Sequence, residues 1–204
     1  MPFSRDEFLA IFAAYNRGVW PIQLLLLAVA LACMAAIVRG RPDATRRALA
    51  GLAVLWLWMA VVYHWMFFTR INPMAWVFGG MFAAQAVALA VAAFRGPTRH
   101  VAPRIDRGLG LGLVGYALVI YPAIGQLSDH PWPSAPSFGL PCPTTIFTLG
   151  VLLAASPRPR RRLVILPSLW AGVGSFAPFA FGVWEDLGLT VAAVLVVIRS
   201  LARR

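Results

Sequence analysis

The chain has 204 residues, of which 60% are hydrophobic and only 12% are charged. Soluble domains usually carry about twice that share of charged residues, so the composition excludes an ordinary soluble domain and favours a membrane protein. All 18 basic residues are arginine, and the formal net charge is +11. These arginines stand in short clusters between long apolar runs, so no nucleic-acid partner is expected.

The N-terminal segment, residues 1–17, predicts a short amphipathic helix on the membrane surface. Ser4 and Glu7 have the spacing of a capping box, in which each side chain bonds the backbone amide of the other residue. The helix is expected to insert an apolar face into the interface between lipid and water. That face consists of Phe8, Leu9, Ile11, Phe12 and Tyr15.

Seven apolar runs follow in residues 20–198. A helix needs about 20 apolar residues to cross the hydrocarbon core of a bilayer. The runs predict membrane spans at residues 20–38, 48–68, 73–94, 109–127, 143–155, 163–182 and 187–198. We therefore expect residues 1–204 to form a single all-α domain, a polytopic transmembrane bundle of seven helices.

The arginines predict the orientation of this bundle, because cytoplasmic loops retain Lys and Arg. Alternate loops and the C-terminal tail hold 15 of the 18 arginines: Arg39, Arg41, Arg46, Arg47, Arg95, Arg99, Arg104, Arg107, Arg158, Arg160, Arg161, Arg162, Arg199, Arg203 and Arg204. The N-terminus is therefore expected outside and the C-terminus in the cytoplasm, in a multi-pass protein of the inner (plasma) membrane. The arginine loops would face anionic lipid headgroups.

Two of the predicted spans have unusual starts. Asn72 can cap the third helix, and Pro73 suits its first position. The fifth run has only about 13 apolar residues, roughly 20 Å of helix, which is too short for a core of about 30 Å. The segment before it, residues 128–141, is rich in proline. Irregular backbone at this depth must line a cavity or be buried in protein, so the helix start with Cys142, Thr144 and Thr145 is expected to face a wet outer cavity.

Polar side chains gather at the predicted outer ends of the spans. Ionisable groups at membrane depth are costly, and they are functional candidates for that reason. The expected binding residues are His64, Arg70, Asn72, Tyr121, Asp129, His130, Cys142, Thr144, Thr145 and Glu185. Two alternatives stay open: the charged residues are solvated loop ends, and His64 bonds a neighbouring helix.

A soft metal ion such as copper is a weaker alternative, for which His64, His130 and Cys142 are the candidate ligands. The sequence has no CxxC or HxxxH motif, so no cofactor is expected. It also lacks the Gly-x-Ser-x-Gly and HExxH motifs of hydrolases. No catalytic residue is therefore assigned, and an enzyme is not favoured.

Two stretches, YHWMFFTRINP at residues 63–73 and GLPCPTTIF at residues 139–147, resemble a bacterial family of multi-spanning membrane proteins. That family is catalogued only as a domain of unknown function. The resemblance implies a helical membrane fold and carries over no functional residue.

Together these patterns favour a small helical carrier or channel for an ion or a small polar solute, with a polar vestibule on the outside. His64 would be its proton- or ligand-responsive group. One alternative is a sensor or assembly protein that transports nothing, and another is a membrane metal-binding or redox protein. The sequence also allows a homo-oligomer.

Overall fold

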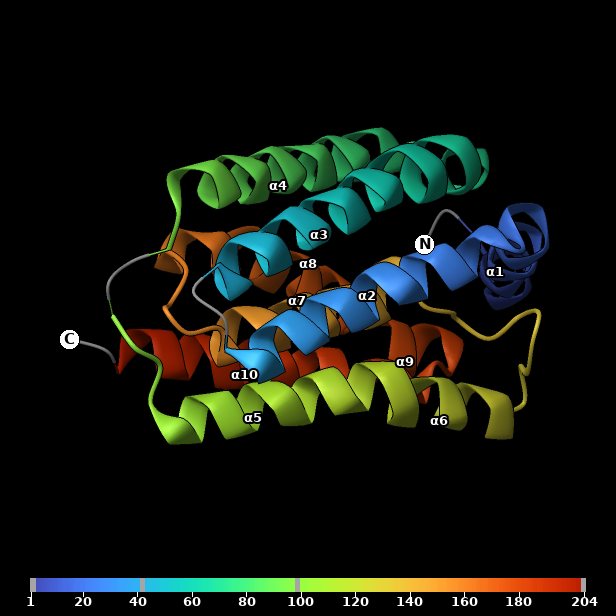
Figure 1. The fold of residues 1–204 in the computed structure, drawn as a ribbon. Coiled ribbons are helices and arrows are strands. Elements are labelled where there is room, and N and C mark those ends of the chain that lie inside the picture. The colour runs from blue at the N-terminus through green and yellow to red at the C-terminus, as the bar shows by residue number, and fades with distance from the viewer. Residues whose placement is uncertain (1–2, 41–42, 98–99, 203–204) are drawn as a thin grey trace.

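The computed structural model describes residues 3–40, 43–97 and 100–202, so Arg41, Arg99, Arg203 and Arg204 lie outside the described residues. The described residues fold into helices, with one isolated bridge between Phe138 and Leu140 and no strand. Helix α1 (Arg5–Val19) is followed by seven helical rods that run alternately between two ends of a bundle (Figure 1). The all-α class is confirmed.

Each predicted apolar run is helical. In chain order, the rods are α2 (Ile22–Arg39); α3 (Ala44–Trp58), the π-helix η1 (Met59–Phe67) and the 3-10 turn η2 (Phe68–Arg70); α4 (Ala75–Arg95); α5 (Arg104–Gly115), the π-helix η3 (Tyr116–Ile120) and α6 (Tyr121–Leu127); α7 (Pro141–Ala154); η4 (Arg161–Val164), α8 (Ile165–Gly174) and α9 (Ala177–Phe181); and η5 (Trp184–Asp186) with α10 (Leu187–Leu201). Five rods in the described residues are long and apolar enough to cross a membrane: Ile22–Arg39, Ala44–Arg70, Ala75–Arg95, Arg104–Leu127 and Arg161–Phe181.

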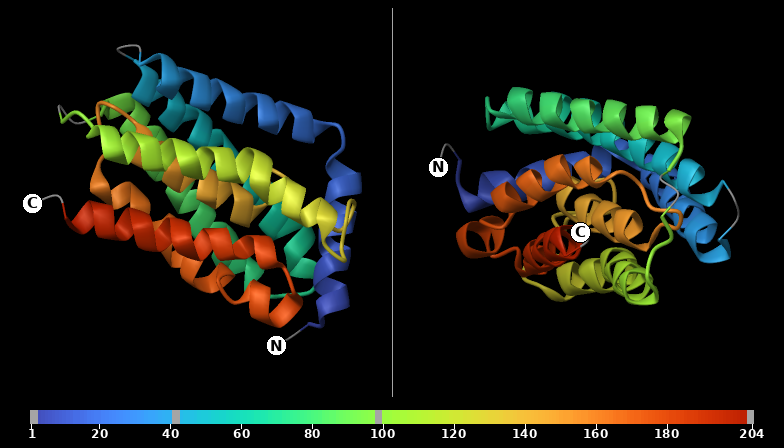
Figure 2. Two further views of the ribbon diagram at one scale, coloured as in Figure 1. Left: turned by 90° about the horizontal axis from the view of Figure 1, so that it is seen from below. Right: turned by 90° about the vertical axis from the view of Figure 1, so that its left-hand side faces the viewer.

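The short helix α7 lies in the middle of the bundle. It contacts α5, α8 and α10 as well as α2 and α3, and all of its residues except Cys142 are buried. Figure 2 shows α7 enclosed by other helices. At the contact with α5, a Cβ on Gly110 would lie 2.5 Å from the carbonyl oxygen of Gly150, so the two backbones touch. Because protein covers α7, its length need not match the thickness of the lipid.

Helix α1 lies across one end of the bundle (Figure 2), which we call the α1 end. The predicted capping box is present: Ser4 Oγ accepts from the Glu7 amide, and the Glu7 carboxylate accepts from the Ser4 amide. The prediction that its apolar face enters lipid is wrong. That face is buried against the bundle, and the Tyr15 hydroxyl donates to the Gly139 carbonyl at 3.1 Å. An amphipathic pattern shows that a face is apolar, but not whether lipid or protein covers it.

The opposite end holds the arginine clusters, and we call it the arginine end (Figure 1). Some of these arginines bind the protein itself. Arg46 donates to the carbonyls of Ala93 and Phe94 at the end of α4. The carboxylate of Asp106 is completely buried, and it is bound by Arg158 and by Arg199, the latter at 2.6 Å. These contacts tie the arginine end together, and Asp106 had no place in the sequence-based candidates.

Candidate functional site

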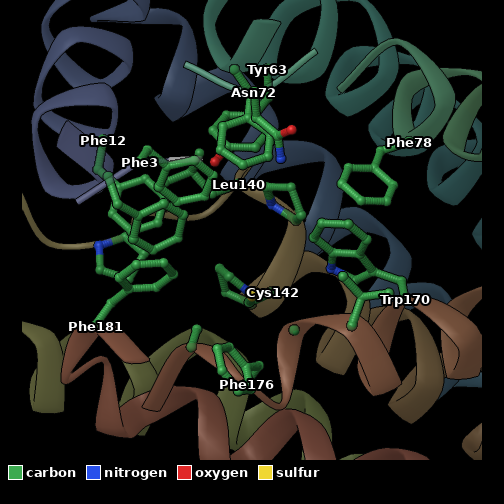
Figure 3. A pocket seen from close by; sticks show the side chains of 18 residues that line it. Phe3, Phe12, Tyr63, Asn72, Phe78, Leu140, Cys142, Trp170, Phe176 and Phe181 are labelled. Carbon is green, nitrogen blue, oxygen red and sulfur yellow. The ribbon is translucent and has the colours of Figure 1, made fainter. Parts of the chain in front are cut away.

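A cavity of about 190 Å³ lies at the α1 end, between α1, η1, α4, the start of α7, α8 and α9 (Figure 3). Nine aromatic side chains line it: Phe3, Phe8, Phe12, Tyr63, Phe68, Phe78, Trp170, Phe176 and Phe181. The helix α1 and Phe3, two residues before its start, supply three of these rings, so this segment forms one wall of the cavity. The lining of this cavity is thus mainly aromatic.

Four side chains of the cavity lining carry polar atoms: Tyr63, Asn72, Cys142 and Trp170. The Oδ1 atom of Asn72 accepts from the Met74 amide at 3.0 Å. The α-helix α4 begins at Ala75, two residues after the predicted start at Pro73, and the Asn72 side chain caps the turn that leads into it. The indole N–H of Trp170 has no oxygen or nitrogen acceptor among the described residues, and it faces the sulfur of Cys142.

His64 lies behind this wall, in the π-helix η1. Its ring is fully buried, with ring centroids 4.6 Å from Phe82 and 5.3 Å from Trp170. Neither ring nitrogen has a hydrogen-bond partner in the described part of the chain. The structure therefore places His64 outside the cavity lining and also without the neighbouring-helix bond that was its alternative. π-Helical turns are frequent at functional sites.

Two adjacent acids are buried next to the cavity wall, in the turn η5. The Tyr121 hydroxyl donates to Asp186 Oδ1 at 2.6 Å, and the thiol of Cys142 lies within hydrogen-bonding reach of the same carboxyl. Asp186 is thus a buried carboxyl held by a hydrogen bond from the neighbouring rod.

Glu185 begins a chain of alternating charges that reaches the surface, which we call the Arg5–Glu185 chain. His130 Nε2 lies 3.2 Å from Glu185 Oε1, and His130 Nδ1 lies 2.9 Å from Asp129 Oδ1. Arg5 then donates to Asp129 Oδ2 at 2.7 Å and to the Phe181 carbonyl at 2.9 Å. The hydrogen bond with Glu185 raises the pKa of His130, and the bond with His130 lowers the pKa of Asp129. The Arg5–Glu185 chain of charges therefore links α1 to the loops before α7 and α10.

A family model matches residues 5–204, which include every member of the cavity wall except Phe3 and every member of the Arg5–Glu185 chain. The chain belongs to the family of unknown function DUF6064. Its resemblance to an uncharacterised family is thereby confirmed. No curated protein and no solved structure matches it.

Of the ten predicted site residues in this DUF6064 chain, only Asn72 and Cys142 line the cavity. Arg70 is exposed, donates to the Met66 carbonyl, and lies over the Phe67 ring at 4.8 Å. Thr144 and Thr145 are buried inside the bundle. The Thr144 amide already donates to Leu140, and its hydroxyl accepts from Gly139. The expectation that Thr144 and Thr145 at the helix start face a wet cavity is therefore wrong.

Arg5 and Trp170 were missing from the sequence-based candidates of this DUF6064 chain, and Asp186 was not among the expected binding residues. Asp186 has a sequence signal, because it adjoins the predicted Glu185 in an otherwise acid-poor chain. Trp170 lies inside an apolar run, where sequence cannot distinguish a cavity wall from a lipid-facing position. Within the residues that the structure describes, no group of three or more His, Cys, Asp or Glu side chains is arranged to hold a metal ion.

Proposed function

We propose that the protein is an integral membrane protein in which all seven rods cross the bilayer, with the α1 end outside. The described arginines support this: eleven lie at the arginine end and only Arg5, Arg17 and Arg70 at the α1 end, and cytoplasmic loops retain such charge. The helix α10 has 15 residues and α7 has 14. Neighbouring rods cover α7 on every side, which compensates for its shortness.

In this orientation, the α1 end binds a small, largely apolar molecule. The observation that carries the proposal is the aromatic cavity of about 190 Å³. An apolar cavity of ~150 Å³ holds benzene, so this one has room for a single ring with a short substituent. An ion would lose its hydration there and find few compensating polar groups. The cavity therefore favours an apolar ligand over the ion or polar solute expected from the sequence.

Binding without transport is the better account of this cavity. A small apolar molecule crosses lipid unaided, so it gains little from a carrier. The arginine end is moreover closed by the packing of α7 against α5 and by the bonds of Asp106 to Arg158 and Arg199. A membrane protein that senses or stores its ligand at the outer end accounts for both observations.

A matched pair of variants on α9 tests ligand binding in the cavity. Ala177 lines the cavity, whereas Ala180 does not. Toluene at 100 times its dissociation constant should stabilise the folded protein in nanodiscs by about 2.7 kcal/mol, which is measured as a rise in melting temperature. We expect this rise in the wild type and in Ala180→Phe but not in Ala177→Phe, where the new ring fills the cavity. The same rise in all three proteins would rule out the cavity as the binding site.

A carrier is the second candidate function, because Glu185 and Asp186 are buried carboxyls in a membrane bundle, and such groups mark ion pathways. Proteoliposomes containing a pH-sensitive dye, with an imposed sodium, potassium or ammonium gradient, test this. Flux that exceeds empty liposomes and is lost in Asp186→Asn would favour the carrier. If the flux of His64→Ala equals that of the wild type, His64 takes no part in the mechanism.

A further inference from the structure

We infer that one anionic phospholipid of the cytoplasmic leaflet binds in a groove at the arginine end, between the rod that starts at η4 and the helix α10. Its phosphate contacts Arg161 and Arg162, and part of one acyl chain lies along the groove. This inference goes beyond the cavity at the α1 end, and it rests on the proposed membrane placement. Three observations carry it: the open apolar groove, the two unpaired arginines in it, and the shortage of acids at this end.

The groove, which we call the α8–α10 groove, follows the contact between these two helices. The turn η4 begins at the arginine end, where α10 ends (Figure 1), and both η4 and α8 contact α10. The groove has a volume of about 470 Å³. Its apolar walls come from side chains one turn apart on each helix, Ile165 and Leu169 on α8 and Val197 and Leu201 on α10. All four are exposed, so the groove lies open on the side of the bundle.

Arg161 and Arg162 lie at the arginine end of this groove. Both line it, and both are exposed. Neither guanidinium group forms a hydrogen bond or an ion pair with another residue that the structure describes, in contrast to Arg158, which binds Asp106. A guanidinium group offers paired N–H donors that match the oxygens of a phosphate. This part of the groove is therefore suited to a phosphate.

Acids are too few at the arginine end to balance its arginines. The described residues place eleven arginines there but only two acids, Asp43 and Asp106. Asp106 is bound by Arg158 and Arg199, and Asp43 pairs with Arg47. The α8–α10 groove has no acid in its described lining. The anion that matches its arginines therefore comes from outside the described chain, and anionic lipids of the cytoplasmic leaflet are attracted to such basic segments.

Two other grooves at the same end are poorer matches for a phosphate. One lies between α3 and α4 and the other between α2 and α3, and both contain Asp43 and Arg47. The carboxylate of Asp43 repels a phosphate and already occupies Arg47. In the first of these grooves, Arg46 donates to two backbone carbonyls at the end of α4. The comparison favours the α8–α10 groove over its neighbours.

The apolar length of the α8–α10 groove favours a lipid over a soluble anion. Leu169 lies seven residues beyond Arg162, which is roughly 10 Å of helix at 1.5 Å per residue. In the proposed orientation, this direction runs from the headgroups into the hydrocarbon core. A phospholipid with its phosphate at the arginines covers Leu169 and Val197 with an acyl chain, and each CH2 group buried there adds to the affinity. A soluble phosphate leaves these walls uncovered.

Two lipids with identical acyl chains test the inference: palmitoyl-oleoyl phosphatidylglycerol, which is anionic, and palmitoyl-oleoyl phosphatidylcholine, which has no net charge. Binding of the first lipid to the full chain in detergent micelles is measured by native mass spectrometry. We expect phosphatidylglycerol to bind about tenfold tighter than phosphatidylcholine, because two basic residues attract its charge. Equal affinities would overturn the inference.

A matched pair of double variants tests the arginines. Arg161→Gln combined with Arg162→Gln should remove the preference for phosphatidylglycerol. Arg39→Gln combined with Arg47→Gln removes the same charge at the same end, from the groove between α2 and α3 that contains Asp43, and should preserve the preference. Equal losses in the two double variants would show diffuse attraction by the whole basic end and would overturn the site.

A second matched pair tests the acyl chain. Val197→Trp fills the α8–α10 groove, whereas Ile198→Trp places the same ring at nearly the same depth on an exposed part of α10 outside the groove. Only Val197→Trp should weaken phosphatidylglycerol, by severalfold. If Val197→Trp binds the lipid as the wild type does, and glycerol 3-phosphate displaces the lipid, the site takes a soluble anion and the inference is wrong.

An alkaline phosphatase fused after the C-terminus separates this inference from the proposed function. The disulfides of that enzyme form only outside the cytoplasm, so the fusion should be inactive in the proposed orientation. An active fusion would contradict both the proposed orientation and a lipid of the cytoplasmic leaflet. With an inactive fusion, equal binding of the two lipids overturns the lipid site alone and leaves the proposed function standing.

Discussion

The two ends of the bundle hold their buried acids in different ways. At the arginine end, Asp106 is bound by Arg158 and Arg199, whose guanidinium groups stay charged at any physiological pH. At the α1 end, Glu185 is bound by His130, and histidine titrates near neutrality. The arginine end is therefore fixed by permanent charge, whereas the end that contains the cavity is held by groups that change protonation.

The largest effect should come from breaking the permanent charges. Asp106→Asn leaves two arginines beside a neutral amide, and removing one partner of a buried ion pair costs about 3 to 5 kcal/mol. The free energy of unfolding, measured by equilibrium unfolding in mixed detergent micelles, should fall by this amount. The control is Asp43→Asn, because Asp43 pairs with Arg47 on the surface, where ion pairs contribute roughly 0 to 1 kcal/mol. Equal losses in the two variants would refute the buried role of Asp106.

A smaller effect should come from titrating the α1 end. Because Glu185 raises the pKa of His130, the protonated form stabilises the fold fully below the ordinary histidine pKa of about 6.5 and loses that effect as the pH rises through the raised value. Stability at the α1 end should thus fall as the pH rises above about 6.5.

Hydrogen exchange, corrected for intrinsic rates, measures this difference between the ends. A hydrogen bond to a charged group contributes about 1.5 kcal/mol or more, so protection of η5 and of residues 128–140 should drop about tenfold above neutral pH. Protection of α5 around Asp106 should stay constant. His130→Gln should remove the pH dependence at the α1 end. A drop of equal size at both ends would contradict the comparison.

The smallest effect should come from the surface contact of α1. Arg5 joins α1 to Asp129 and to the Phe181 carbonyl, so Arg5→Gln should increase hydrogen exchange in α1 severalfold and loosen one wall of the cavity. The matched control is Arg70→Gln, at an exposed arginine that contacts only its own rod among the described residues. Exchange in α1 should not change in that control. No difference between the two variants would remove Arg5 from the closure of the cavity.

The sequence predicts the positions of the helices well, but it predicts poorly which helix faces and side chains come into contact. Long apolar runs such as α2 are helical because an apolar segment that leaves water must satisfy its own backbone hydrogen bonds, and that requirement is local. Whether the face of α1 meets lipid or protein depends on which helices end beside it. The same holds for Asp106. In the sequence it is one more charge near an arginine loop, and its partners Arg158 and Arg199 come from distant segments that only the fold brings together.

The candidate site was predicted in part for the same reason. Asn72 and Cys142 lie on the cavity wall, and His130 and Glu185 bond each other, as polar residues at one membrane depth can. Arg70 lies at that depth too, but it is directed outward, because depth alone does not specify which side of a helix a residue occupies. The aromatic nature of the cavity comes from rings on six separate segments, and no single segment shows it.

The enclosure of α7 also constrains how the protein is assembled during synthesis. The helix α7 is made before α8 and α10, yet these two helices cover much of its surface. It has only 14 residues, which is short for stable insertion by itself. A nascent chain released after α7 would therefore lack the cover that this helix needs. In the proposed membrane orientation, the last two rods complete the cover of α7, and a chain that ends within them should be degraded faster than the full chain.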